Sequence, residues 1–324
     1  MTEPEQTRRS FLRLIERART PLDPELQPLP SPALGVRAES FSFASEAGQR
    51  VSGLLLQDEE ANGTARPALI VAHGTGGSKE AVLPLLLTLA ARGFVAVAID
   101  ARHHGQRVGR PDAGSAAYVA AIFDKFKGAP GYPFLYDTVW DLMRTLDYLE
   151  QRPDIDARRI GLLGISKGGM ETYLTAAADP RLAAAVPVLG VQSYAYALEH
   201  EVWRPRVETF QGAFDSAAQH ASVAAPDAAF VRHFYDRVAP GIYSEFDGPL
   251  MLPCIAPRPL LVINGELDAR TPGLELCRAA AEVAYARAGA PEAFSLHVQA
   301  QTGHEFTECA AQLALVWLER WLER

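Results

Sequence analysis

A serine flanked by glycines lies in the middle of the chain, in the stretch GLLGISKGGMET at residues 161–172. Gly164, Ser166 and Gly168 form the pattern G-x-S-x-G, which presents a serine hydroxyl at a sharp turn from a strand into a helix. The residues before Ser166 are aliphatic and those after it favour a helix, as this geometry requires. A hydroxyl so placed becomes a nucleophile when a base removes its proton. We therefore predict that Ser166 is a nucleophile; the alternative is an ordinary serine in a glycine-rich turn.

A base and an acid for this nucleophile follow later in the chain. His304 lies in QTGHEF, between the last predicted strand and the last predicted helix. Asp268 lies in GELDARTP, after the preceding strand, and can hold the imidazole in the required tautomer. Nucleophile, acid and base in the chain order Ser166, Asp268, His304 are what we expect of an architecture built around such a turn. Glu266 is the alternative acid, and Asp268 is then a helix-capping residue.

The elements that position these residues alternate between apolar strands and amphipathic helices. Such alternation predicts a mostly parallel sheet covered by helices on both faces, an α/β fold. The clearest helix is 134–150, where leucine and valine recur every three or four residues. Buried strands are expected at 67–74, 94–100, 159–165, 184–190, 259–266 and 294–300, with further helices at 79–93, 168–178 and 305–324.

Two segments depart from this alternation. Residues 39–57 alternate around a turn and predict an antiparallel hairpin. Residues 191–256 are rich in aromatic and charged side chains and are too long for a simple loop, so we expect an inserted helical cap. Residues 101–133 are interpreted as a loop. We therefore divide the chain into an N-terminal arm, 1–34, and one domain, 35–324, that carries the cap.

The motifs together resemble the α/β-hydrolase superfamily, in its dienelactone-hydrolase-like and acetylesterase-like group of serine hydrolases. Beyond the serine motif, they are VAHGTGG (71–77), DARHHG (100–105), GELDARTP (265–272) and TGHEF (302–306). The resemblance covers about residues 36–324. It implies that Ser166 is the nucleophile, that His304 is the general base and then the acid, and that Asp268 orients the imidazole.

The resemblance also implies an oxyanion hole made by two backbone N–H groups, those of Thr75 and Lys167. A lysine directly after the nucleophile departs from the usual pattern, and we expect its charged side chain near the site, where it favours an anionic substrate. His73 is expected to support the oxyanion loop rather than to act as a base. The DARHHG loop is expected to support the site by hydrogen bonding, and its histidines are not expected to bind a metal.

The composition of the chain argues against several other classes of protein. The chain has 324 residues and a net charge of −8, which argues against a nucleic-acid-binding surface. Three widely spaced cysteines form no disulfide framework or metal-ligand pair, and no apolar stretch is long enough to span a membrane. We expect a cytoplasmic enzyme that needs no cofactor and no metal and acts on a small-molecule ester. Its oligomeric state is not predicted.

The N-terminus contains TRRSFLR, which is similar to a twin-arginine export signal. Such a signal requires an apolar stretch next, but LIERARTPLDPE carries charges and prolines. We expect instead an amphipathic helix with Phe11, Leu14, Ile15 and Ala18 on one face. The prolines of residues 21–34 predict an extended connector that is neither helix nor a good strand.

Several alternatives stay open at this stage. The same triad serves thioesterases, lactonases and small peptidases, and a non-catalytic hydrolase fold that binds a ligand is an alternative of another class. Aromatic residues at 118–136 and in the cap either line an apolar pocket or pack the cap onto the core. Arg204 and Arg206 either bind a substrate carboxylate or lie on a solvated face.

Overall fold

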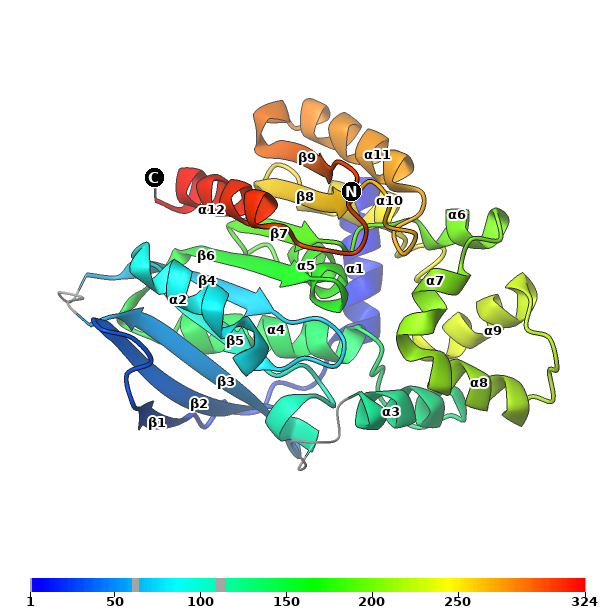
Figure 1. The fold of residues 1–324 in the computed structure, drawn as a ribbon, viewed down its shortest axis with the longest axis horizontal. Coiled ribbons are helices and arrows are strands. Elements are labelled where there is room, and N and C mark those ends of the chain that lie inside the picture. Colours follow the sequence, from blue (N-terminus) through cyan, green and yellow to red (C-terminus); the bar gives the residue numbers. More distant parts are fainter. Residues whose placement is uncertain (1, 60–63, 109–114, 324) are drawn as a thin grey trace.

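A nine-stranded sheet forms the centre of the computed structural model, which describes residues 2–59, 64–108 and 115–323 (Figure 1). The strand order is β1-β2-β3-β5-β4-β6-β7-β8-β9, antiparallel from β1 to β5 and parallel from β5 to β9. The predicted mostly parallel sheet and the N-terminal hairpin are confirmed. The strands are β1 (Glu25–Leu29), β2 (Val36–Glu46), β3 (Gln49–Asp58), β4 (Arg66–Ala72), β5 (Val95–Ile99), β6 (Ile155–Ile165), β7 (Ala184–Val188), β8 (Leu260–Gly265) and β9 (Phe294–Gln299).

Helices cover both faces of this sheet, as predicted (Figure 1). Apolar side chains of α2 and α12 pack on one face, while those of α4, α5 and α11 pack on the other. Every residue of β5 and β7 is buried, because both faces of these strands are covered. These helices are α2 (Leu83–Ala91), α4 (Tyr136–Leu149), α5 (Lys167–Ala178), α11 (Leu274–Arg287) and α12 (Glu308–Leu322).

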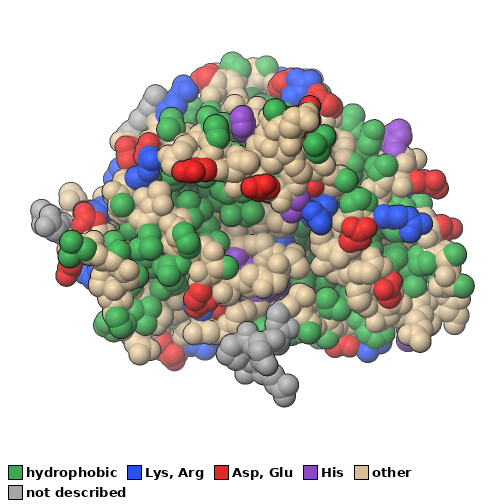
Figure 2. Space-filling model, in the orientation of Figure 1, with side chains coloured by type: hydrophobic (Ala, Val, Ile, Leu, Met, Phe, Trp, Pro, Cys, Tyr) green, Lys and Arg blue, Asp and Glu red, His purple; other side chains and the backbone are tan. Residues whose placement is uncertain are grey.

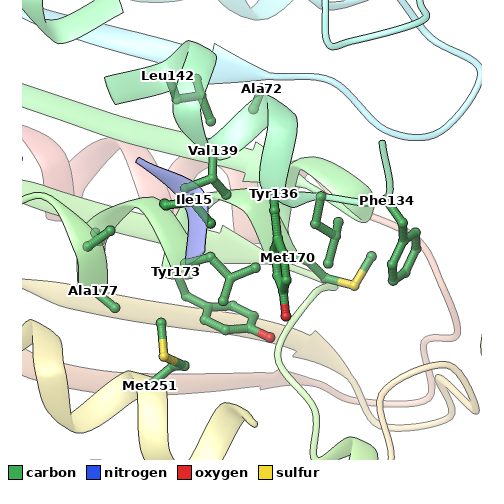
Figure 3. Packing of buried hydrophobic residues seen from close by; sticks show 14 of the residues in the cluster. Ile15, Ala72, Phe134, Tyr136, Val139, Leu142, Met170, Tyr173, Ala177 and Met251 are labelled. Carbon is green, nitrogen blue, oxygen red and sulfur yellow. The ribbon is translucent and has the colours of Figure 1, made fainter. Parts of the chain in front are cut away.

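The N-terminal arm is built into the core. Helix α1 (Glu3–Ile15) buries Phe11 and Ile15, and Ile15 lies close to Tyr173 of α5 and Val139 of α4 (Figure 3). The helix expected here is therefore present, but Ala18 does not belong to its buried face, because α1 ends at Ile15 and Ala18 is exposed.

The proline-rich connector contains a strand that the sequence did not predict. Strand β1 includes Pro28, which pairs with Glu39 of β2. A proline is tolerated here because β1 is the edge of the sheet, where only one side of the strand needs hydrogen-bonding partners.

Residues 191–256, called the inserted segment below, lie between β7 and β8 and are largely helical. The helices within residues 211–238 of this segment pack beside α3 (Ala116–Phe126), at the end of the sheet where β4–β8 terminate (Figure 1). Helix α3 lies within the stretch interpreted as a loop; residues 109–114 of that stretch are outside the described residues. The segment contains α6 (Tyr194–Glu199), α7 (Arg204–Val207), η3 (Glu208–Phe210), α8 (Gln211–His220), α9 (Ala228–Val238), α10 (Gly248–Met251) and η4 (Leu252–Ile255).

Aromatic side chains join the inserted segment to α3 and to the start of α4. Phe126 stacks on Phe234 at 5.7 Å between ring centroids, and Phe134 meets Phe210 edge-on at 5.0 Å. The sequence left open whether these aromatic residues line an apolar pocket or pack the segment onto the core. Phe126 and Phe134 do the second.

Short 3-10 helices complete the structure: η1 (Lys79–Val82), η2 (Gly105–Val108) and η5 (Pro291–Ala293). On the face shown in Figure 2, acidic and basic side chains are interspersed and form no continuous basic stripe. Among the described ranges, no helix is both long and apolar enough to cross a membrane.

Candidate active site

Ser166 occupies a strained turn between β6 and α5. Its φ is 59° and its ψ is −113°, a conformation that a side chain disfavours. The two glycines of the motif allow the close approach. A Cβ at Gly164 would lie 2.1 Å from the carbonyl oxygen of Gly168, and one at Gly168 would lie 2.2 Å from the carbonyl oxygen of Ala72. The sharp strand-to-helix turn inferred from the sequence is present.

The three residues predicted as nucleophile, base and acid meet at the carboxyl end of the sheet. His304 Nε2 lies 2.7 Å from Ser166 Oγ, and His304 Nδ1 lies 2.7 Å from Asp268 Oδ2. With Nδ1–H donating to the carboxylate, Nε2 is free to accept the serine proton. The side chain of His304 is 18% exposed and that of Asp268 is 1% exposed, so water has little access to the carboxylate.

Asp268 is held as a carboxylate. Burial by itself raises the pKa of Asp268, but the hydrogen bond and charge of His304 and the amide of Arg270 outweigh it, and the pKa lies below its ordinary value. The Arg270 N–H donates to Asp268 Oδ1 at 3.0 Å. Glu266, the alternative acid, is exposed and instead accepts a hydrogen bond from the backbone of Gln301 at 2.7 Å.

Gln299, which the sequence reasoning missed, braces the loop that carries His304. It ends β9 and is buried. Its Nε2 donates to the carbonyl oxygen of Glu305 at 2.8 Å, and its Oε1 accepts from both the amide (3.0 Å) and the hydroxyl (2.8 Å) of Thr307. A buried glutamine with all these bonds ties the residues that follow His304 to the end of β9. The available signal was a glutamine at the end of a predicted strand, just before the loop that carries His304.

A network of polar side chains supports the loop after β4. The His73 ring joins the carbonyl oxygen of Gly74 (2.8 Å) to the backbone N–H of Ala101 (3.1 Å). Asp100 accepts from the backbone N–H of Lys79 at 2.9 Å and from its ammonium at 2.8 Å. Burial and the nearby Lys167 charge lower the pKa of His73 to about 3, so its ring is neutral and bridges one donor and one acceptor.

The two residues predicted as oxyanion donors belong to segments that adjoin Ser166. Lys167 is the first residue of α5, and an N–H in the first turn of a helix has no acceptor within that helix. Thr75 follows Gly74, where an added Cβ would be 3.6 Å from Ser166 Cβ, so this loop runs beside the serine. Helix α5 also directs the positive end of its dipole toward the serine.

The side chain of Lys167 does not extend into the open site. It is 1% exposed, and its ammonium lies 2.8 Å from Glu171 Oε1 one turn along α5. The expectation that this lysine favours an anionic substrate therefore loses its basis, because a buried carboxylate already balances the charge.

The buried histidine of the DARHHG loop is held by a backbone contact. His104 is buried, and burial together with the charge of Lys167 lowers its pKa to about 2. Its Nδ1 lies 2.9 Å from the carbonyl oxygen of Arg102. Within the described part of the chain, no three histidine, cysteine, aspartate or glutamate side chains are grouped as metal ligands.

The sheet order, the serine at the turn after β6 and the helices on both faces define an α/β-hydrolase. The chain belongs to the acetyl xylan esterase (AXE1) family, whose family model matches residues 11–197. The model of the prolyl oligopeptidase family also matches, over residues 135–323. The resemblance to α/β-hydrolases inferred from the motifs is confirmed.

Two individual proteins similar to this chain are named as a hydrolase and an esterase. YtaP of Bacillus subtilis (strain 168), which bears a provisional name as a hydrolase, is 26% identical over 186 residues, 57% of this chain and 53% of its own. YitV of the same organism, provisionally named an esterase, is 29% identical over 157 residues, 48% of this chain and 57% of its own. The alignments therefore span little more than half the length of these two relatives.

Among solved structures, the acetyl xylan esterase from Paenibacillus sp. R4 is similar over 98% of this chain and 93% of its own, with a TM-score of 0.64. At 21% sequence identity, this likeness shows a common fold.

Proposed function

We propose that this protein hydrolyses carboxylic esters through an acyl-enzyme intermediate on Ser166. One observation carries the proposal, the unbroken hydrogen-bond chain Asp268–His304–Ser166 with two distances of 2.7 Å. Membership of a family described as acetyl xylan esterases supports an ester as the substrate and makes a small acetyl ester the first one to test.

In the proposed reaction, Ser166 Oγ attacks the ester carbonyl carbon while His304 Nε2 takes the hydroxyl proton. Asp268 stabilises the imidazolium that forms and keeps its Nδ1–H directed at the carboxylate. His304 then protonates the leaving alcohol. In the second half, His304 removes a proton from water, the water attacks the acyl group, and Ser166 is released with its proton restored.

The negative oxygen that forms in each half is assigned to the backbone N–H groups of Thr75 and Lys167. Removing one such donor typically costs about 3 kcal/mol of transition-state stabilisation. Support comes from the position of Lys167 at the free N-terminus of α5 and from the loop beside Ser166 Cβ. The bonds from His73 and Asp100 hold that loop before substrate arrives, so little reorganisation is needed.

Replacing the nucleophile tests the proposal. Ser166→Ala should lower kcat on 4-nitrophenyl acetate by about a thousand-fold or more, because the attacking atom is removed. The release of 4-nitrophenol measures the rate. A matched control is Ser216→Ala on the exposed side of α8, which should retain wild-type activity. Full activity in Ser166→Ala would remove the proposal.

Labelling separates catalysis from simple ligand binding. A fluorophosphonate should modify wild-type protein at Ser166 and leave Ser166→Ala unmodified, because it requires an activated serine. An unlabelled, folded wild-type protein would favour the non-catalytic alternative. A parallel screen with an acetyl thioester, a lactone and an aminoacyl amide decides among the other reactions that use this triad.

The finer assignments are also proposals. We assign residues 191–256 the role of a cap over the site, supported by their helices at the end of the sheet that carries Ser166 (Figure 1). We propose a small-molecule ester as the partner and the cytoplasm as the compartment. The charges that follow TRRSFLR and the burial of Phe11 in the core support that compartment.

A further inference from the structure

Arg206 of α7 is buried, with 2% of its surface exposed, so the solvated face, one of the two alternatives that the sequence left open for it, is excluded. Its Nη2 donates to the carbonyl oxygen of Arg270 at 2.6 Å. Its Nε donates to the side-chain oxygen of Gln192, at 3.1 Å in the amide orientation that also satisfies Tyr194. Within residues 2–59, 64–108 and 115–323, no carboxylate forms an ion pair with this guanidinium. A buried charge without a counter-ion is unfavourable, so its presence calls for an explanation.

The guanidinium of Arg206 lies beside the loop of the catalytic acid. The Arg270 carbonyl that it contacts belongs to the residue whose N–H donates to Asp268 Oδ1. The positive charge of Arg206 also contributes to the low pKa of Asp268, after the larger effects of burial and of His304. The inserted segment therefore brings to the edge of the proposed triad a buried positive charge that forms no direct ion pair with a carboxylate of the described residues.

Two further buried donors have no acceptor, one on Arg270, whose carbonyl Arg206 contacts, and one on Tyr118 of α3. Arg270 Nε and Tyr118 Oη are both buried, and neither has a hydrogen-bond partner in the described part of the chain. Burial raises the pKa of Tyr118 well above its ordinary value, so the hydroxyl keeps its proton. The positive charge of Arg206 acts in the opposite direction, lowering this pKa, but the effect of burial is larger. The Tyr118 ring is 6.0 Å from the ammonium of Lys167, the residue that follows the nucleophile.

Resting on the proposed ester hydrolysis, we propose that Arg206, with Arg270 and Tyr118, forms a subsite for a carboxylate carried by the ester substrate. Unpaired donors require acceptor oxygens, and a carboxylate supplies two that match the planar donor pairs of a guanidinium. The ligand would also provide the counter-ion that buried Arg206 lacks. The substrate class is therefore an ester whose acyl or alcohol part bears a negative charge.

Matched ester pairs test this subsite on both sides of the scissile bond. For the acyl side, the pair is mono-4-nitrophenyl glutarate and 4-nitrophenyl 5-methylhexanoate, in which an isopropyl group replaces the carboxylate. For the alcohol side, the pair is 4-carboxyphenyl acetate and 4-(methoxycarbonyl)phenyl acetate. The quantity compared is the ratio of kcat/KM for the anionic ester to that for the neutral ester. A partly unfolded variant does not change this ratio, because both esters report on the same active fraction.

In Arg206→Gln, the ratio for at least one pair should fall by about ten- to a hundred-fold, as expected for loss of a hydrogen bond to a charged group. Arg206→Lys should restore part of the loss, since it keeps the charge without the planar donor pairs. The control is Arg204→Gln on the same short helix, which removes an equal charge from an exposed side chain stacked on Trp203 at 4.7 Å. That variant should leave both ratios unchanged.

An equal loss on the anionic and neutral esters of both pairs would overturn the subsite and assign Arg206 to holding the Asp268 loop. Ratios that change as much in Arg204→Gln would also overturn it, because the effect would then be one of net charge. Failure of ester hydrolysis itself is distinguishable, since wild-type protein would then cleave none of the four esters and would not be labelled by a fluorophosphonate.

Discussion

Two buried aspartates in this protein are kept ionised by the groups that contact them. Asp268, near the serine, is kept ionised by His304 and by a backbone amide. Asp141 of α4 is kept ionised by two arginines, away from the triad. Neither carboxylate is exposed, so the partners and not the solvent set the charge. Removing one partner therefore has consequences that can be given a sign and a pH range.

Asp141 gives a prediction for stability. It is fully buried, and it accepts hydrogen bonds from Arg102 at 2.7 and 3.1 Å and from Arg107 at 2.6 Å. Asp141→Asn removes the carboxylate shared by two buried guanidinium groups; Arg102 keeps its pair with Glu46, but the structure gives Arg107 no other ion pair within the described residues. The free energy of unfolding should fall by about 3–5 kcal/mol at pH 7. Urea unfolding measures the loss. The control Asp124→Asn, in an exposed pair with Lys127, should change stability by less than about 0.5 kcal/mol.

The pH dependence of this effect follows from the same group. Burial raises the pKa of Asp141, but the charges of Arg107 and Arg102 outweigh it and hold the pKa below its ordinary value. The stabilisation is therefore complete above the unfolded-state pKa of about 3.9 and is lost as the pH falls below it. The gap between wild type and Asp141→Asn should narrow from pH 5 toward pH 2. A gap that widens over this range would contradict the assignment.

At the scale of elements, the strand-to-helix turn after β6 depends on backbone atoms that approach very closely. Gly168, the second residue of α5, lies against the end of β4, where an added Cβ would be 2.2 Å from the carbonyl oxygen of Ala72 and 2.9 Å from that of His73. Both neighbours are backbone atoms, so the clash cannot be relieved by the movement of a flexible side chain. A methyl group at this position must displace the nucleophile or the loop that carries Thr75.

Gly168→Ala should therefore lower kcat/KM on 4-nitrophenyl acetate by about a hundred-fold, since a shift of about 1 Å in a reacting group has that effect. Near-ultraviolet circular dichroism of the purified variant checks that it is folded. The matched control is Gly303→Ala, next to His304, where an added Cβ has no atom within 4 Å and activity should be nearly normal. Equal activity in the two variants would show that the turn tolerates a side chain.

The elements that the sequence predicted are those with a simple local pattern. Strands β4, β5, β7 and β8 and the second half of β6 were expected because strands buried on both faces are continuously apolar. Strand β9, at the edge of the sheet, was expected although it is only partly buried and less apolar. Strand β1 was missed because Pro28 disfavours a strand except at a sheet edge, and the position of a strand in the sheet is not local information. Helix α3 was missed although Tyr118, Ile122 and Phe126 recur every four residues and are all buried.

For the candidate site, sequence order and motif context were sufficient to select Ser166, Asp268 and His304, and their side chains lie within hydrogen-bonding distance of one another. They did not predict the burial of Arg206, which depends on its contact with Arg270, far away in sequence. They also did not predict Gln299, whose partners are close in sequence but reach it only because the loop that carries His304 folds back. The Lys167 side chain points toward Glu171, one helical turn further along α5. This i, i+4 pair of opposite charges could have been recognised in the sequence.

At the scale of the whole molecule, the first helix joins parts of the chain that are far apart in sequence. Phe11 of α1 is fully buried, meeting Tyr136 of α4 edge-on at 5.1 Å and Phe246 of the inserted segment at 5.1 Å. Arg8 donates to the carbonyl oxygen of Ala177 in α5 at 2.7 Å. The division into an arm and a domain stays a prediction, but in these contacts α1 belongs to the same core that supports the serine.

Phe11→Ala should accordingly destabilise the whole molecule and not only the arm. The loss should be about 3–5 kcal/mol, the usual effect of removing a buried phenylalanine side chain and leaving a cavity. Guanidinium unfolding followed by both circular dichroism and esterase activity should move to lower denaturant in one coincident transition. Arg13→Ala, on the exposed side of α1, should stay within about 0.5 kcal/mol of wild type. If α1 unfolded first in Phe11→Ala while activity persisted to the wild-type midpoint, the arm would be an independent unit and the site would not depend on it.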